Sequence, residues 1–373
     1  MKAFYAPGPK SNENRGRVLP VTILTISGAL VAHRHERTPN GPLLDAGDAS
    51  RVKSGKLLAG TPSPGSRNAS QEGPGTSPHA RGGEGDSRWK LPICLETTMQ
   101  LGLGLPISNP RLLTGWARRA ESCGFDTLAL LDRLAYHNPE PLVALSVLTG
   151  ATSRIRLQTE VLIGPLRATA LLAKQVATLD VMSGGRFTLG IGIGGREDDH
   201  AAAGTPITAR GRFLETQLTE LRRIWHGEHY QDATVGPRPD TPAGPPILVG
   251  AFAPAALRRV ARHGDGFLCA APLTWADKLV RTVHDEWTAA GRSGRPRLVC
   301  QVNVALGAAF APARSAIAAY YGRDDWGIPI ADPNELVDTV AAYRAFGADE
   351  LVLYCYADDP SQVDTLAGIL GLS

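Results

Sequence analysis

The sequence has few cysteines, and they form no recognisable pattern. Five are spread over 373 residues, an odd number, and no two of them form a Cys-x-x-Cys pair. A disulfide framework uses an even, clustered set of cysteines, and a zinc knuckle uses closely spaced pairs. The spacing therefore disfavours both, predicts no metal site, and indicates a protein of the reducing cytoplasm.

A large excess of charge of either sign is also missing. Residues 1–98 hold 13 Lys and Arg against 8 Asp and Glu, whereas residues 99–373 hold 26 against 28, and the total is +3. Residues 99–373 are so close to neutrality that they lack the basic surface of a nucleic-acid-binding protein. At 43% apolar residues the chain can still bury a large core, which excludes disorder throughout.

Long hydrophobic runs are scarce as well. The apolar run at residues 18–32 has 15 residues, fewer than the roughly 20 that span a bilayer. Basic residues precede it, so a secretory signal peptide is one interpretation. Pro20 interrupts the run and it ends without a clean small-x-small cleavage site. These features favour a cytoplasmic protein with no membrane partner.

The leader, residues 1–98, has the composition of a disordered segment. Residues 33–90 are rich in Gly, Pro and Ser and have almost no periodic apolar residues, so they bury too little surface to offset chain entropy. Two interpretations stay open: a native leader, or translated upstream sequence before a natural start at Met99. The first expected strand begins just after Met99, which favours the second. We expect a chain that starts there to fold.

The body, residues 99–373, alternates short apolar runs with amphipathic helical patterns. About eight helices separate eight expected strands, at 100–106, 125–131, 155–163, 186–193, 246–249, 266–270, 298–306 and 350–354. Strands separated by helices pair in parallel, so eight such units predict an α/β fold of the (β/α)8 or TIM-barrel type. The segment 307–332 is too long for a simple crossover and predicts an insertion near the carboxyl-terminal mouth, where such barrels place their chemistry.

Glycines crowd the end of the fourth expected strand, in the string AKQVATLDVMSGGRFTLGIGIGGREDD at residues 173–199. Glycine lets a flat ring or a phosphate approach the backbone, although many such runs are only tight turns. The whole string resembles a block of the bacterial luciferase-like superfamily of flavin-dependent monooxygenases and oxidoreductases. The resemblance includes LGLGLP at 101–106, AESCGFDTL at 120–128 and PPILVGAFAPAALRRVARHGDGF at 245–267, and it covers nearly all of the body and none of the leader.

The resemblance implies a binding site for a flavin ring. Thr159, Glu160 and Val161 match the place where the family often has a non-prolyl cis peptide beneath the ring. Glu160 is an unusual occupant, and its alternative interpretation is a buried glutamate paired with an arginine inside the barrel. Gly192 matches the position against the reactive edge of the ring. Gly194 and Gly195 match backbone contacts nearer the phosphate.

The resemblance and the local sequence together predict the phosphate site at Gly250, Ala251 and Phe252. A strand ends there and a helix starts at Pro254, so free N–H groups and the helix dipole favour an anion. The family commonly has Ser or Thr in this loop, and here they are absent. Arg210 or Arg212 is the candidate for the compensating positive charge, with an ordinary surface arginine as the alternative for each.

The expected catalytic position departs from the family. Luciferases have a histidine after an acidic residue at the end of the second strand, where this chain has Asp132 followed by Arg133. Arg133 stays protonated and cannot be a general base, but it can stabilise developing negative charge. We expect Asp132 to be the ion-pair partner of Arg133. His137 and His200 are candidate proton carriers, each with an exposed loop histidine as the alternative.

The resemblance implies an enzyme, a luciferase-like flavin-dependent monooxygenase. It would use reduced FMN and dioxygen to oxygenate a small organic substrate through a peroxyflavin. No second dinucleotide-binding motif is present, so a separate flavin reductase is the expected partner. Three alternatives stay open: hydride transfer with the deazaflavin coenzyme, a non-catalytic flavin-binding protein, and a barrel enzyme for a phosphorylated metabolite. The family is often dimeric, so a homodimer is also expected.

Overall fold

The structure, a computed structural model, describes residues 98–105 and 109–372. All described residues lie in one compact unit. The expectations for the leader, including its disorder and its dispensability, concern residues almost entirely outside the described part. Among the described residues, no helix is both long enough and apolar enough to cross a membrane.

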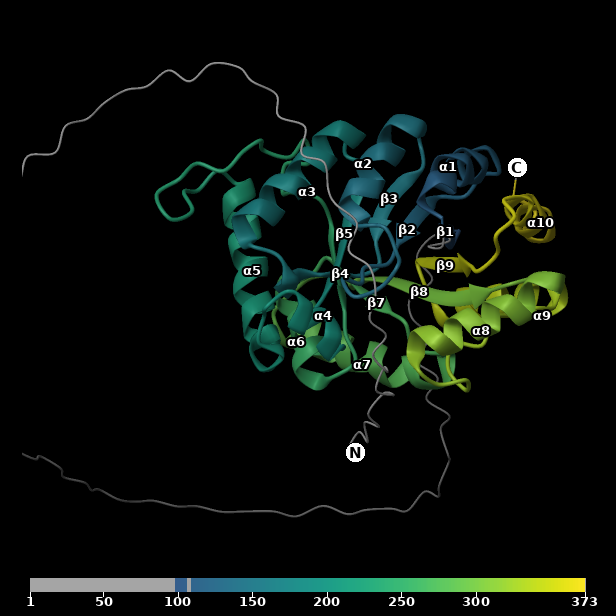
Figure 1. Cartoon of the computed structure of the whole chain (residues 1–373). Helices are drawn as coiled ribbons and strands as arrows, with labels where there is room; N and C mark the ends of the chain where they lie inside the picture. Colours follow the sequence, from purple (N-terminus) through teal and green to yellow (C-terminus); the bar gives the residue numbers. More distant parts are fainter. Residues whose placement is uncertain (1–97, 106–108, 373) are drawn as a thin grey trace, which may run out of the picture. The chain divides into compact units, whose positions relative to one another are not determined.

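This unit is a closed barrel of parallel strands ringed by helices (Figure 1). The strands are β1 (Gln100–Gly104), β2 (Thr127–Leu130), β3 (Arg156–Thr159), β4 (Leu162–Ile163), β5 (Phe187–Gly192), β6 (Ile247–Gly250), β7 (Gly266–Cys269), β8 (Arg297–Val304) and β9 (Glu350–Cys355). Their order is β3-β2-β1-β9-β8-β7-β6-β5-β4, and a β3–β5 pairing closes the ring. Because β3 and β4 are two pieces of the third expected strand, the eight-stranded TIM barrel is confirmed.

The helices lie outside the strands, as the apolar periodicity predicts. They are α1 (Leu113–Ser122), α2 (Pro141–Ala151), α3 (Thr169–Ser183), α5 (Arg210–Trp225), α6 (Pro254–His263), α7 (Leu273–Ala289), α9 (Pro333–Phe346) and α10 (Ser361–Leu370). Helix α9 illustrates the local signals at both ends. The Asp332 side chain accepts hydrogen bonds from the first-turn N–H groups, and Gly347 ends the helix at a φ of 88°.

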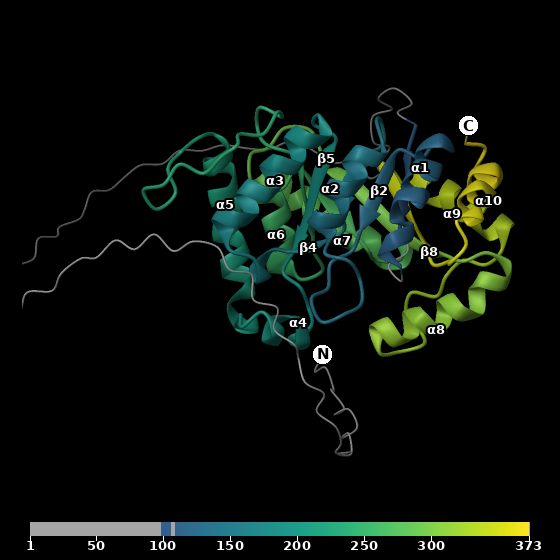
Figure 2. The same cartoon turned by 45° about the horizontal axis from the view of Figure 1, so that its top comes forward.

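Two helices were not expected from the sequence, α4 (Glu197–Ala202) and α8 (Phe310–Tyr321). Each follows the carboxyl end of a strand, β5 and β8 respectively, and Figure 2 shows both along the same edge of the barrel. Helix α8 occupies the first half of the expected insertion, and the rest of the insertion returns to the barrel so that Ile330 pairs with Val304. The insertion is therefore an ordered element at the mouth, the barrel end where the strands have their carboxyl termini.

Alternation along the strands separates an inner core from an outer one. On β9, Val352 and Tyr354 belong to an inner cluster with Leu268 and Val299, whereas Leu351 and Leu353 pack with the helices. A period of two residues per strand produces this division. Because the inner cluster is small, the inside of this barrel has room for glycines and polar side chains.

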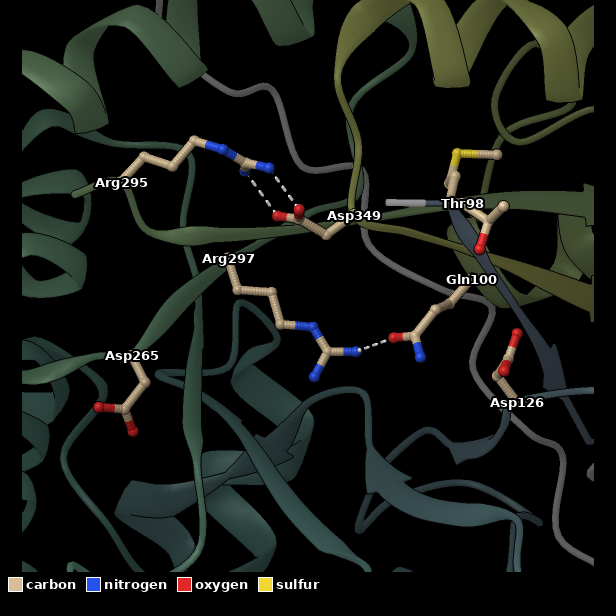
Figure 3. Close-up of a pocket in the computed structure, with 8 residues that line it drawn as sticks. Thr98, Gln100, Asp126, Asp265, Arg295, Arg297 and Asp349 are labelled. Atoms are coloured by element: carbon tan, nitrogen blue, oxygen red, sulfur yellow. Dashed lines mark hydrogen bonds and ion pairs between the residues drawn. The ribbon is translucent and has the colours of Figure 1, made fainter. Parts of the chain in front are cut away.

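The amino-terminal ends of the strands form a charged network (Figure 3). Arg297 contacts Glu350 at 2.5 Å, and Arg295 donates two hydrogen bonds to Asp349. These residues and their neighbours surround a cavity of about 880 Å³. Residues at this end of a TIM barrel serve stability, because the chemistry lies on the loops at the other end. The functional site is therefore sought at the mouth.

Candidate functional site

The break between β3 and β4 is a cis peptide bond between Glu160 and Val161. It lies where the resemblance places one. The Val161 side chain is held between two glycines on neighbouring strands. A Cβ atom on Gly192 or on Gly250 would come within 2.9 Å of a Val161 methyl group. Gly190 is also required, because a Cβ there would overlap the carbonyl oxygen of Thr159. The fold thus brings together five residues that the sequence analysis selected: Thr159, Glu160, Val161, Gly192 and Gly250.

Glu160 is buried in the barrel without a partner for its charge. Only 7% of the residue is exposed, and neither carboxyl oxygen has a hydrogen bond within the described structure. Burial, and secondarily the negative charge of Glu350, raises the pKa of Glu160 well above its ordinary value. The alternative interpretation, a pairing of Glu160 with an arginine, is wrong, because Arg156 and Arg297 contact Glu350 instead. Burial therefore favours the protonated, neutral form of Glu160.

Tyr354 lies beside Glu160 at the mouth. Its hydroxyl donates to the carbonyl oxygen of Glu160 at 3.3 Å, which joins β9 to the cis peptide. Burial raises the pKa of Tyr354 well above the ordinary value, so the phenol keeps its proton. Its ring occupies the space where a side chain on Gly104 would be, since a Cβ there would lie 2.5 Å from the ring.

Arg133 is the buried centre of a cluster of charged and aromatic residues. Its Nε lies 2.5 Å from Oδ2 of Asp199, and its Nη2 lies 3.1 Å from Asp198. The guanidinium also lies over the rings of Tyr136 and Tyr320, at 5.6 and 5.4 Å from their centroids. These five residues are called the Arg133 cluster. They come from the loop after β2, from α4 and from α8, so the cluster joins three segments of the mouth.

The cluster keeps Arg133 charged and leaves one of its donors free. Burial alone would lower the pKa of Arg133, but the hydrogen bond and charge of Asp199 raise it overall. The Nη1 atom of Arg133 is buried and has no hydrogen-bond partner among the described residues. An orphaned, charged donor of this kind is suited to an anionic or oxygen-bearing ligand.

Asp132 is not the partner of Arg133, contrary to expectation. It accepts from Nη1 of Arg167 at 2.6 Å and from the backbone N–H of Ile163 at 2.8 Å. Successive residues at a strand end point to opposite sides, so adjacent charges seldom face each other. The true partner, Asp199, also accepts hydrogen bonds from the backbone N–H groups of residues 134 and 135.

The two candidate histidines have different environments. His137 is exposed, as the alternative interpretation had it. His200 is 1% exposed, with Nδ1 at 3.0 Å from the Thr205 hydroxyl and Nε2 at 3.1 Å from the carbonyl oxygen of Ile193. A carbonyl oxygen only accepts, so Nε2 carries the proton and Nδ1 is the acceptor. The protein therefore uses both ring nitrogens of His200.

The predicted phosphate loop lies where β6 meets α6. Helix α6 starts after Ala253 without a side-chain cap. Pro254 has no N–H and the Ala256 N–H bonds the Ala253 carbonyl, so the Ala255 N–H is the first-turn donor available to an anion. Ala251 is buried and Phe252 is 53% exposed. Arg212 is exposed, whereas Arg210 is half-buried, donates to the Ile207 carbonyl and leaves its buried Nε without a partner. Arg210 is the better candidate for the positive charge.

Sequence reasoning missed most of the aromatic residues at the mouth. Tyr320 and Tyr321 end α8, and Tyr354 and Tyr356 end β9. Burial raises the pKa of Tyr321 to about 12. The available signal was the pairing of tyrosines in YY and YCY near strand and insertion ends, but their convergence depends on the fold.

Comparison with known proteins gives the family. The sequence profile of the Luciferase-like monooxygenase family matches residues 90–346. The chain belongs to this family. The match starts at residue 90, so the expected limit of the resemblance at residue 99 is corrected by nine residues. The members of this luciferase-like family are oxidoreductases or monooxygenases.

Individual similarities are consistent with the family. The chain is 31% identical over 169 residues to an uncharacterised protein of Mycobacterium tuberculosis, covering 43% of the chain and 60% of that relative. It is 28% identical over 325 residues, 71% of the chain and 96% of the relative, to an F420-dependent glucose-6-phosphate dehydrogenase of Intrasporangium calvum. The fold is similar to that of the monooxygenase RslO1 from Streptomyces bottropensis, with a TM-score of 0.62, 20% identity, and coverage of 74% of this chain and 97% of that one.

Proposed function

We propose that this luciferase-like protein binds reduced FMN at its mouth and uses dioxygen to oxygenate a small organic substrate. The observation that carries the proposal is the Val161 side chain seated between Gly192 and Gly250 beside the cis peptide. A floor made of one small side chain and two glycines fits a flat ring. The uncapped start of α6 suits the phosphate, and Arg210, at the start of α5, is the proposed source of the positive charge.

The residues of the chain have distinct roles in this proposal. Reduced FMN would supply the electrons for oxygen activation, itself reduced by a separate reductase. Arg133 provides a fixed positive charge and an unused Nη1 donor where negative charge develops. Glu160 and Tyr354 keep their protons in the barrel interior and can donate hydrogen bonds. The tyrosines of the mouth exclude water from the reacting centre.

A second candidate is hydride transfer with the deazaflavin coenzyme. The observation favouring it is the similarity to relatives named as F420-dependent glucose-6-phosphate dehydrogenases. The same floor suits either ring system. The two differ in that the deazaflavin reaction consumes no oxygen.

Spectral titration separates the candidates. The full-length protein is titrated with FMN, riboflavin and the deazaflavin coenzyme, and oxygen consumption is followed with each reduced form. We expect FMN to bind more tightly than riboflavin, and reduced FMN with oxygen to convert an added substrate into an oxygenated product. Equal affinity for FMN and riboflavin contradicts the phosphate site. Preferential binding of the deazaflavin coenzyme without oxygen uptake establishes the second candidate, and tight FMN binding with no turnover establishes a binding protein.

The backbone at residues 250–252 can be tested in the same assay. Gly250→Pro removes one N–H and is expected to abolish FMN binding, whereas Phe252→Ala changes only a half-exposed side chain and should weaken it less. Arg210→Ala is expected to reduce the preference for FMN over riboflavin, and Arg212→Ala serves as the exposed control.

A further inference from the structure

A cavity at the mouth, separate from the one at the amino-terminal ends of the strands, lies beside the carboxyl ends of β7 and β8. Its volume is about 460 Å³, in the range of small-molecule sites. Its lining includes Trp275 at the start of α7, Gln301 and Asn303 on β8, and the segment that follows α8. It therefore lies between the barrel and the insertion. We call it the aromatic pocket, with Trp275, Gln301, Asn303, Tyr321, Trp326 and Ile328 as its defining residues.

Aromatic and aliphatic side chains form part of the walls of the aromatic pocket. The rings of Trp275 and Trp326 lie 5.0 Å apart, and Tyr321 meets Trp326 at 6.4 Å, nearly edge to face. Trp275 is 50% exposed and Ile328 is 53% exposed. When a ligand covers large apolar side chains that were in contact with water, the free energy of the system falls. Aromatic side chains also favour ligands with rings, because rings pack in preferred geometries.

The barrel strand β8 contributes two neutral polar side chains to the pocket, Gln301 and Asn303. The Gln301 side chain has no hydrogen-bond partner among the described residues and offers both a donor and an acceptor. Asn303 uses its Nδ2 to hold the carbonyl oxygen of Gly327 at 2.7 Å, which fixes the loop beneath Trp326. Gln301 is thus the polar group available to a ligand.

The charges of the pocket neutralise each other. Arg323 and Asp325 are the charged residues of its described lining, and they form two hydrogen bonds of 2.6 Å with each other at the exposed rim. A phosphorylated sugar needs cationic or multiple N–H donors to replace its hydration. This lining provides no unpaired cation.

We propose that the aromatic pocket binds the substrate, and that the substrate is an uncharged aromatic compound with a hydroxyl or carbonyl group that hydrogen-bonds to Gln301. The inference rests on the proposed function for its assignment as the substrate site, but the binding itself needs no coenzyme. It predicts a substrate class different from the sugar phosphate named for one relative.

The test is isothermal titration of the full-length protein, free of coenzyme, with 2-naphthol and with glucose 6-phosphate. We expect naphthol to bind and glucose 6-phosphate to bind at least about tenfold more weakly. Trp326→Ala should weaken naphthol binding by about tenfold or more. Gln301→Leu should weaken the binding of 2-naphthol more than the binding of naphthalene, because naphthalene has no hydroxyl group. Phe213→Ala, an exposed aromatic residue of a different cavity, is the matched control and should change nothing.

The outcomes separate this proposal from the function. Tighter binding of glucose 6-phosphate, or naphthol binding unchanged in both pocket variants, overturns the aromatic pocket. Thermal unfolding of each variant identifies a folding defect, and Gln301→Leu provides the answer if Trp326→Ala is unstable. If the pocket variants weaken naphthol binding but the protein binds no flavin, the proposed function is overturned and the aromatic pocket is not.

Discussion

Arg133 and Asp199 lie 66 positions apart in the chain and form a buried ion pair, with 2.5 Å between Nε and Oδ2. The side chains are 4% and 1% exposed. Forming a pair this deeply buried costs desolvation free energy. Removing one partner is strongly destabilising, because it leaves an uncompensated buried charge. The pair also fixes the loop after β2 against α4, because Asp199 accepts two backbone N–H groups of that loop.

Asp199→Asn is expected to lower the free energy of unfolding by about 3–5 kcal/mol, because it leaves the buried Arg133 charge without its counter-charge. Asp198 contacts the same arginine but is 48% exposed, so Asp198→Asn is expected to cost less than about 1 kcal/mol. Urea denaturation of both variants measures the difference. Equal losses would show that the buried pair has no special role.

Arg133→Ala is expected to lower kcat/KM by the equivalent of about 2–4 kcal/mol, the scale for one preorganised donor at a developing negative charge. Arg133→Lys keeps the charge without the planar fork and should keep part of the activity. In the proposed role Arg133 acts by fixed charge, so the ionisations in the pH–rate profile should be the same in Arg133→Lys and in the native protein.

The histidines provide the control for this series. A neutral-pH ionisation lost only in His137→Ala or only in His200→Ala identifies the proton carrier. A native rate in Arg133→Ala, with intact coupling to oxygen, would remove Arg133 from the chemistry. Unfolding curves are required alongside, because the cluster also contributes to stability.

Glu160 predicts a specific dependence of stability on pH. The folded protein keeps the Glu160 proton because its pKa is raised, whereas the unfolded chain releases it above about pH 4.3. Above that pH the folded state binds more protons, so this contribution to stability falls as pH rises and is lost as pH passes the folded pKa. Glu160→Gln removes it, so the variant should gain stability relative to the native protein between about pH 5 and pH 8.

Denaturation at several pH values measures the Glu160 effect. The same substitution at an exposed position, Glu197→Gln, is the matched control. A constant difference for Glu160→Gln would mean that Glu160 is ionised in the folded protein. Infrared detection of a protonated carboxyl group, absent from Glu160→Gln, is an independent readout.

The glycines around Val161 are expected to control coenzyme binding. Gly192→Ala and Gly250→Ala each place a methyl group within 2.9 Å of Val161, which must move. We expect each to weaken binding of the coenzyme ring by about tenfold or more, equivalent to about 1.4 kcal/mol. Gly150→Ala on α2 meets nothing within 4 Å and is the control. Unchanged ring affinity in both variants would place the ring elsewhere.

The sequence predicts the barrel well because each strand and helix carries its own local pattern. Strand order follows from the alternation. The cis peptide and the position of Gly192 were implied by the resemblance to the luciferase-like superfamily, and the structure has the cis peptide at Glu160–Val161. Helix α4 escaped prediction because its first turn is Glu197, Asp198 and Asp199, which read as a polar loop. Helix α8 escaped because its Pro and Gly neighbours interrupt the apolar period.

The partners of the site residues were beyond prediction for a different reason. Asp132 and Arg133 are adjacent residues that follow β2, and this proximity in the chain made Asp132 the apparent ion-pair partner. The actual partners of Arg133 come from α4 and α8, and only the closed ring brings those segments together. Glu160 shows the same limit, since whether an arginine reaches it depends on packing across the barrel.

The backbone carbonyl of Tyr320 accepts a hydrogen bond from Arg196 at 2.9 Å, while the ring of the same residue lies against Arg133. The loops after β2, β5 and β8 are therefore joined as one unit. Transplanting the insertion alone into another barrel would remove Tyr320 from both of its contacts. Engineering of substrate preference in this scaffold consequently requires the three loops to be exchanged together, and natural variation among them should be inherited as a set.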